Sequence, residues 1–151
     1  MRELTIIIDN FGHKELKGYL MSLTGVSDVI IENEIHLQIY VKYDPNLITP
    51  KIIKMEILLF LDIKTPSILA FDKHPIVKTS KYKIVKDTIC CEYCLKGAIE
   101  TLFEIEGIEK AESNFNFKNV NKQNGIIINI EYNLELINLD TMKQIESSLN
   151  I

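Results

Sequence analysis

The chain has 151 residues, of which 46% are hydrophobic and 25% are charged, and its formal net charge is −4. This composition is typical of a soluble globular protein with one domain or two small ones, and the core needs no disulfide bonds. The negative charge and the lack of a concentrated basic run argue against a nucleic acid partner. No apolar run approaches the roughly 20 residues of a membrane helix, and the first residues do not resemble a signal peptide, so we expect neither membrane insertion nor export.

The first half of the sequence predicts the element order β-α-β-β-α-β from its changes in apolar spacing. The predicted elements are a strand at 3–8, a helix at 13–23, a strand at 26–31, a strand at 35–41, a helix from 50 to 59 and a strand at 67–71. A turn is expected at Asn33. Five apolar residues are expected to line the second helix, namely Ile52, Ile53, Met55, Leu58 and Leu59.

The second half repeats this order. The predicted elements are a strand at 82–85, a helix at 95–105, a strand at 111–117, a turn at 119–125, a strand from 126 and a helix at 142–149 with Asn138 or Asp140 as N-cap. Gly107 and Ile108 correspond to Gly25 and Val26, which indicates an internal repeat. We therefore predict an α+β chain of two tandem ferredoxin-like (βαββαβ) domains, 1–73 and 81–151, joined by a linker at 74–80.

The second repeat is expected to lack its last strand, because the counterpart of 67–71 would fall beyond Ile151. In the strand order 4-1-3-2 of this fold, that loss leaves the strand at 82–85 as an open edge. An open edge invites strand pairing, through which the chain can form a homo-oligomer. Ile76 and Val77 in the linker could instead supply a replacement strand.

All three cysteines, Cys90, Cys91 and Cys94, lie within five positions directly before a predicted helix. Such a cluster is not a disulfide framework, and it favours a reducing, cytoplasmic location. A C-x-x-C turn that leads into a helix brings two sulfurs close enough to share one soft metal ion. Two thiolates suit Cu(I), whereas Zn(II) or Cd(II) prefers three or four ligands, for which Cys90 and Glu92 are the candidates.

These residues resemble the heavy-metal-associated domain family, which includes copper chaperones and the N-terminal modules of soft-metal P-type ATPases. The family pattern is approximately G-M-x-C-x-x-C, a helix, then G-V, and V-x-Y-D-P after the third strand. In this sequence C-x-x-C is Cys91 and Cys94, G-V is Gly107 and Ile108, and the tyrosine is Tyr132. The resemblance covers most of 81–151, although Thr88 and Ile89 replace the Gly and Met of the pattern.

The first repeat matches the same pattern at Gly25 and Val26 and at 41–45, but Asp9 and Gly12 stand where the cysteines would be. The resemblance implies that the first domain has no metal ligands and that the second binds Cu(I) or Zn(II)/Cd(II). It also implies transfer of the ion to a metal-transporting ATPase or another cysteine-bearing acceptor, without enzymatic activity.

Two other functions remain open from the sequence. One is a degenerate domain of this kind that acts as a protein-interaction module. The other is a thiol-disulfide oxidoreductase, which also uses C-x-x-C at the start of a helix. No Ser/His/Asp arrangement or Gly-rich phosphate loop can be assembled, and His13, His36 and His74 are interpreted as parts of the scaffold.

Overall fold

The computed structural model describes residues 1–87, 91–114, 125–149 and 151, and in these residues the chain forms one antiparallel sheet and four helices. The strands are β1 (Arg2–Ile8), β2 (Val26–Asn33), β3 (Leu37–Tyr43), β4 (Ile68–Asp72), β5 (Thr79–Lys86), β6 (Ile108–Ser113) and β7 (Ile126–Asn133). The helices are α1 (Leu16–Met21), α2 (Pro50–Phe60), α3 (Glu92–Glu104) and α4 (Leu139–Ser148). The fold is therefore mixed α and β, as predicted.

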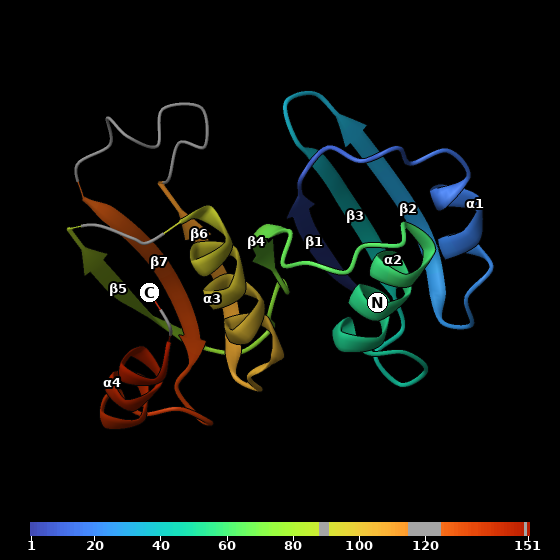
Figure 1. The fold of residues 1–151 in the computed structure, drawn as a ribbon. Helices are drawn as coiled ribbons and strands as arrows, with labels where there is room; N and C mark the ends of the chain where they lie inside the picture. Colours follow the sequence, from blue (N-terminus) through green and yellow to red (C-terminus); the bar gives the residue numbers. More distant parts are fainter. Residues whose placement is uncertain (88–90, 115–124, 150) are drawn as a thin grey trace.

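The seven strands have the order β2-β3-β1-β4-β6-β7-β5 (Figure 1). The first four strands follow the predicted order 4-1-3-2. The two halves of the sequence share this sheet because β4 pairs with β6, with Phe71 opposite Ala111 and Asp72 opposite Lys110. Backbone hydrogen bonds thus run without interruption from the first half into the second.

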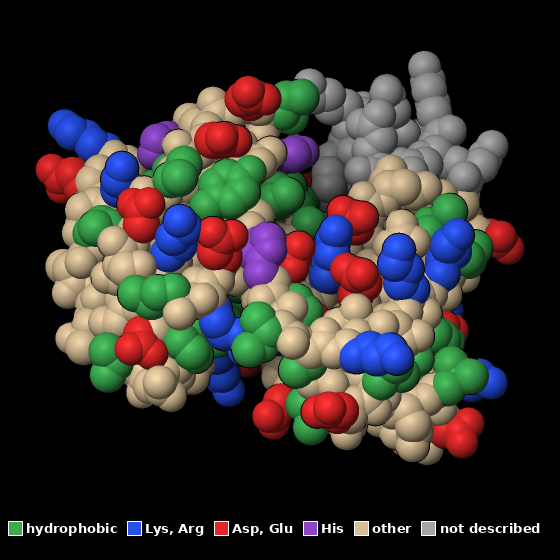
Figure 2. All heavy atoms as spheres, turned by 180° about the vertical axis from the view of Figure 1, so that it is seen from behind, with side chains coloured by type: hydrophobic (Ala, Val, Ile, Leu, Met, Phe, Trp, Pro, Cys, Tyr) green, Lys and Arg blue, Asp and Glu red, His purple; other side chains and the backbone are tan. Residues whose placement is uncertain are grey.

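One face of the sheet is apolar along its whole width. Residues directly opposite on neighbouring strands lie on the same face, and Ile6 is opposite both Ile39 and Phe71, while Ala111 is opposite both Phe71 and Ile130. All five are buried. Figure 1 shows α2 and α3 in front of the sheet, and Figure 2 shows the opposite side, where acidic and basic side chains lie next to one another.

The two halves repeat one local structure at the turn before their second strands. Gly25 and Gly107 have φ angles of 98° and 97°, in the left-handed region that favours glycine. The backbone N–H of Asp44 donates to the Gly25 carbonyl at 2.7 Å, and the N–H of Asn133 donates to the Gly107 carbonyl at 2.7 Å. This agreement supports the internal repeat that the sequence predicts.

Two element boundaries differ from the prediction. Helix α1 begins at Leu16 rather than at His13, because the preceding Glu15 has a left-handed φ of 69°. Strand β3 begins at Leu37 rather than at Ile35, since Asn33 pairs with Leu37 and the residues between them form the connecting loop. The side chain of Ile35 is exposed as a result.

The predicted apolar side of α2 is only partly correct. Ile53 is buried as expected, but the side chains that point inward with it are Lys54 and Ile57. Ile52, Met55 and Leu59 are exposed. This helix carries apolar residues on several sides, and the four-residue spacing of Ile53 and Ile57 determines which side packs on the sheet.

The predicted linker at 74–80 overlaps β5, which begins at Thr79. Ile76 is 86% exposed and lies outside every described strand, so the replacement strand at Ile76 and Val77 was a wrong prediction. In the part of the chain that the structure describes, β5 pairs with β7 alone, which confirms the predicted open edge.

Helix α4 has the predicted N-cap, because the Asn138 side chain accepts a hydrogen bond from the Thr141 N–H at 2.8 Å. Most of the turn predicted at 119–125, and the end of the strand predicted at 111–117, lie outside the described residues. None of the described helices is long and apolar enough to cross a membrane.

Candidate metal site

The N-terminus of α3 carries Cys91 and Cys94. Cys91 is the N-cap, with an extended backbone (φ −167°, ψ 170°), and Cys94 lies in the first turn. The helix is amphipathic, and it packs on β4 and β6 through its buried residues, which include Leu95, Ile99 and Leu102. This apolar side packs on the sheet, and Cys91 at the start of the helix is exposed to solvent.

The sulfur atoms of Cys91 and Cys94 lie 3.6 Å apart. Two thiolates bound tetrahedrally to zinc at about 2.3 Å would be separated by about 3.8 Å, whereas two on opposite sides of an ion at that bond length would be separated by about 4.6 Å. The observed separation is closer to that of a bent pair of ligands than to that of a linear pair, but Cys94 forms a disulfide bond in this structure and must be reduced before it can bind an ion. Cys90, the predicted third thiolate, lies outside the described residues.

A buried lysine lies on the same helix, and sequence reasoning missed it. Lys96 is 4% exposed, and its Nζ donates to Oδ2 of Asp9 at 2.6 Å. Glu92 Oε1 lies 4.0 Å from the same nitrogen, and the Tyr93 ring centroid lies 5.5 Å from it. The ammonium therefore contributes positive charge close to the first turn of α3.

The loop of the first half that corresponds to the cysteine loop has a different role. Its Asp9, which the resemblance places at a cysteine position, binds Lys96. His13 contacts the Asn33 side chain through its Nε2 at 3.0 Å. Across residues 1–87, 91–114 and 125–149, no group of three or more His, Cys, Asp or Glu side chains is arranged to hold a metal ion.

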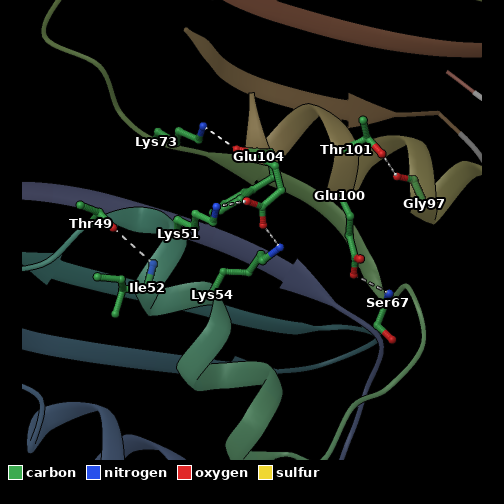
Figure 3. A network of polar contacts seen from close by, with 11 residues as sticks. Thr49, Lys51, Ile52, Lys54, Ser67, Lys73, Gly97, Glu100, Thr101 and Glu104 are labelled. Atoms are coloured by element: carbon green, nitrogen blue, oxygen red, sulfur yellow. Dashed lines mark hydrogen bonds and ion pairs between the residues drawn. The ribbon is translucent and has the colours of Figure 1, made fainter. Parts of the chain in front are cut away.

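Polar contacts from the first half also hold the C-terminal part of α3 (Figure 3). Glu104 binds Lys54, and Lys51 Nζ lies 3.5 Å from its other carboxylate oxygen. Glu100 Oε1 accepts a hydrogen bond from the Ser67 N–H at 3.0 Å. Together with Asp9, these groups anchor α3 to the first half along its whole length.

Two groups in this region have shifted pKa values. Burial lowers the pKa of Lys73 to about 8, although Glu109 and other nearby carboxylates partly oppose the shift. Lys73 Nζ donates to the Phe103 carbonyl at 2.8 Å. Burial alone would raise the pKa of Glu104, but its hydrogen bond with Lys54 and the charges of Lys54 and Lys51 together hold that pKa below its ordinary value.

In its described residues the chain has a single antiparallel sheet and four helices. No protein-family model matches the sequence, and no curated protein matches it either. Among solved structures, the chain is similar to the solution structure of the N-terminal soluble domains of Bacillus subtilis CopA, with 16% identity and a TM-score of 0.36 over 97% of this chain and 88% of that one. A likeness of this degree assigns neither a fold nor a metal to this chain.

Proposed function

We propose that Cys91 and Cys94, in the reduced protein, together bind one soft metal ion at the exposed N-terminus of α3. The observation that carries this proposal is the 3.6 Å separation of their sulfur atoms at an accessible helix end. Binding requires that the disulfide bond of Cys94 is first reduced. Thiolates are the ligands that Cu(I), Zn(II) and Cd(II) prefer.

Cys90 is the candidate third ligand. A bent pair of sulfurs leaves coordination positions for further ligands, as Zn(II) and Cd(II) require. Glu92, in the first turn of the helix, is the other candidate. An ion with an open position can be passed by ligand exchange to the cysteines of an acceptor, for which a metal-transporting ATPase is the partner implied by the family resemblance.

The larger arrangement proposed here is a tandem of two ferredoxin-like units fused through β4 and β6. Its support is the order β2-β3-β1-β4 in the first half, the order β6-β7-β5 in the second, and the matching turns at Gly25 and Gly107. In this arrangement the first unit binds no metal, and its Asp9 holds the helix of the metal site in place. A reducing compartment such as the cytoplasm is the expected location, since the thiols must stay reduced.

Anaerobic metal titration of the reduced protein tests the proposal. Wild type should bind one equivalent of metal with an ultraviolet sulfur-to-metal charge-transfer band, in competition with a chelator of known affinity. Cys91→Ser and Cys94→Ser should each lose affinity by about a hundredfold or more, because each removes one of two anchoring thiolates. Thr101→Ser, in the same helix but away from the cysteines, is the matched control and should bind as wild type does.

The variant Cys90→Ser distinguishes between the candidate metals. If Cys90 is a ligand, this variant loses affinity for Zn(II) and Cd(II) while its Cu(I) binding changes little, since two thiolates suffice for Cu(I). Unchanged binding of every metal in Cys91→Ser would refute the site. A reversible dithiol-disulfide cycle with insulin-reducing activity, without metal binding, would favour the oxidoreductase instead.

A further inference from the structure

The outer edge of β5 has no assigned role. All eight residues of this strand pair with β7, from Thr79 opposite Asn133 to Lys86 opposite Ile126, and no described strand covers its other side. Alternate residues of such an edge strand turn their N–H and C=O groups outward, where another strand can pair with them. In the first half, the corresponding edge of β1 is covered by β4, which shows the geometry that a further strand would adopt.

The side chains of β5 divide between the two faces of the sheet. Tyr82 and Ile84 are opposite the buried Ile130 and Ile128, so both lie on the apolar face. Lys81 and Lys83 alternate with them and are exposed on the other face. Lys86 is opposite the buried Ile126, so it lies on the apolar face with Tyr82 and Ile84. The strand has no acidic residue, although the whole chain has a net charge of −4. Alternation along the strand hides the pair Lys81 and Lys83 from a search for lysine runs.

A depression with a volume of about 380 Å³ lies beside Lys81 and Lys83 on the open face of the sheet. It is also lined by Tyr82 of the same strand and by residues of β6 and β7, namely Lys110, Glu112, Asn129, Ile130 and Glu131. This lining has three lysines and two glutamates, and Glu131 lies opposite Lys81 on β7, so the excess positive charge is small. Such a surface suits a short peptide with alternating acidic residues better than the continuous charge of a nucleic acid backbone. Figure 2 shows this open side of the molecule, where the two signs of charge are mixed.

We propose that the outer edge of β5 binds an extended peptide segment of a partner, in which acidic and apolar residues alternate, as an additional antiparallel strand. The acidic side chains lie on the open face beside Lys81 and Lys83. The apolar side chains lie on the other face and extend the core beside Tyr82 and Ile84. Backbone pairing supplies affinity, and the alternation of side chains supplies selectivity.

The same charges disfavour a second copy of the chain as the occupant. Antiparallel pairing of β5 with β5 of another copy brings Lys81 and Lys83 of both copies together on one face. Like charges opposite each other on paired strands are destabilising. The lysines therefore protect the edge from self-pairing and at the same time select an acidic strand.

The probe is a synthetic peptide of about ten residues, within the usual length of a strand, that alternates Glu and Val. We expect saturable binding to the full chain and slower hydrogen exchange at β5 amides in the wild-type complex. Lys81→Glu together with Lys83→Glu should weaken binding by about tenfold or more, since two attractions become repulsions. Lys14→Glu together with Lys17→Glu, an equal change of charge at exposed sites around α1, should leave binding unchanged.

A peptide of the same composition with all Glu before all Val is the second control. Equal binding of both peptides, or binding without protection of β5 amides, would show a nonspecific attraction and overturn the proposal. Sedimentation of the chain without peptide tests whether a second copy of the chain occupies the edge of β5. A dimer that the alternating peptide dissociates would mean that the edge pairs with a second copy, and the assignment of an acidic partner would be wrong.

Discussion

Lys96 in α3 and Asp9 at the end of β1 form an ion pair between the two halves of the chain, with 2.6 Å between Nζ and Oδ2. The lysine side chain is almost fully buried, whereas the Asp9 side chain is 36% exposed. Removal of one partner therefore has a different cost from removal of the other. Loss of Asp9 leaves the buried ammonium with the more distant Glu92 carboxylate, 4.0 Å away, and this is costly, whereas a partly exposed carboxylate can turn to water.

We predict that Asp9→Ala lowers the free energy of unfolding by about 2–3 kcal/mol, whereas Lys96→Met lowers it by about 1 kcal/mol or less. Urea unfolding of both variants measures the two values. The double variant should resemble Lys96→Met, because Asp9 matters only while the ammonium is present. Equal losses in the two single variants would show that the asymmetry of burial does not control the energetics of this pair.

The half-buried Lys73 predicts a rise in stability with pH. Its pKa is about 8 in the folded protein and 10.5 when the chain is unfolded, so between these values the unfolded state binds more protons and stability increases. The free energy of unfolding of wild type is compared with that of Lys73→Met at each pH. From pH 8 to pH 10 the difference should change by about 1–2 kcal/mol in favour of wild type. Other titrating groups cancel in that difference. A constant difference across this range would contradict the assignment.

The lowered pKa of Glu104 predicts a loss of stability at acid pH. Its pKa is lowered in the folded state, so its contribution is present above the ordinary value of 4.5 and is lost as the pH falls below that value. Glu104→Gln should be less stable than wild type by about 1 kcal/mol at neutral pH, and this gap should close in acid. Thermal unfolding from pH 7 to pH 3 measures both proteins. A gap that persists in acid would mean that the loss comes from packing and not from charge.

The turn at Gly25 predicts a large effect from a small substitution. A Cβ at this position would lie 2.8 Å from Cβ of Leu47 and 2.9 Å from Cγ2 of Ile48, and its φ of 98° disfavours any residue with a side chain. Gly25→Ala should therefore cost about 2–4 kcal/mol. Gly18→Ala is the control, since no atom lies within 4 Å of its added carbon and the residue is in helix α1. It should stabilise the protein by about 0.5–1 kcal/mol, as alanine does in a helix. Similar effects of the two substitutions, measured by urea unfolding, would contradict this account.

The sequence predicted the elements of this fold because apolar spacing is a local property. The alternation around Leu37, Ile39 and Val41 requires a strand with one buried face, and the observed strand contains all three. The convergence of Cys91 and Cys94 was predictable for the same reason, since three-residue spacing at a helix start places two side chains on one side. The glycines at 25 and 107 revealed the repeat because few other residues tolerate their backbone conformation.

The features that could not be predicted depend on which elements meet. The pairing of β4 with β6 uses backbone groups, and the residues opposite one another, such as Ala70 and Glu112, carry no sign of it. The burial of Lys96 follows from the approach of Asp9, a residue far away in the sequence. Only its position three residues before Ile99, on the buried side of α3, gave any local sign. The inward side of α2 was ambiguous for a similar reason.

The pairing of β4 with β6 determines which strand edges would be exposed if the two halves of the chain were separated. A cut in the segment between β4 and β5 would leave each fragment with a newly bare strand and an unmatched set of charges, including Asp9 on one fragment and Lys96 on the other. Such fragments have matching edges and opposite charges at corresponding positions. They should recombine when mixed, so that the two pieces restore one folded molecule without a covalent link.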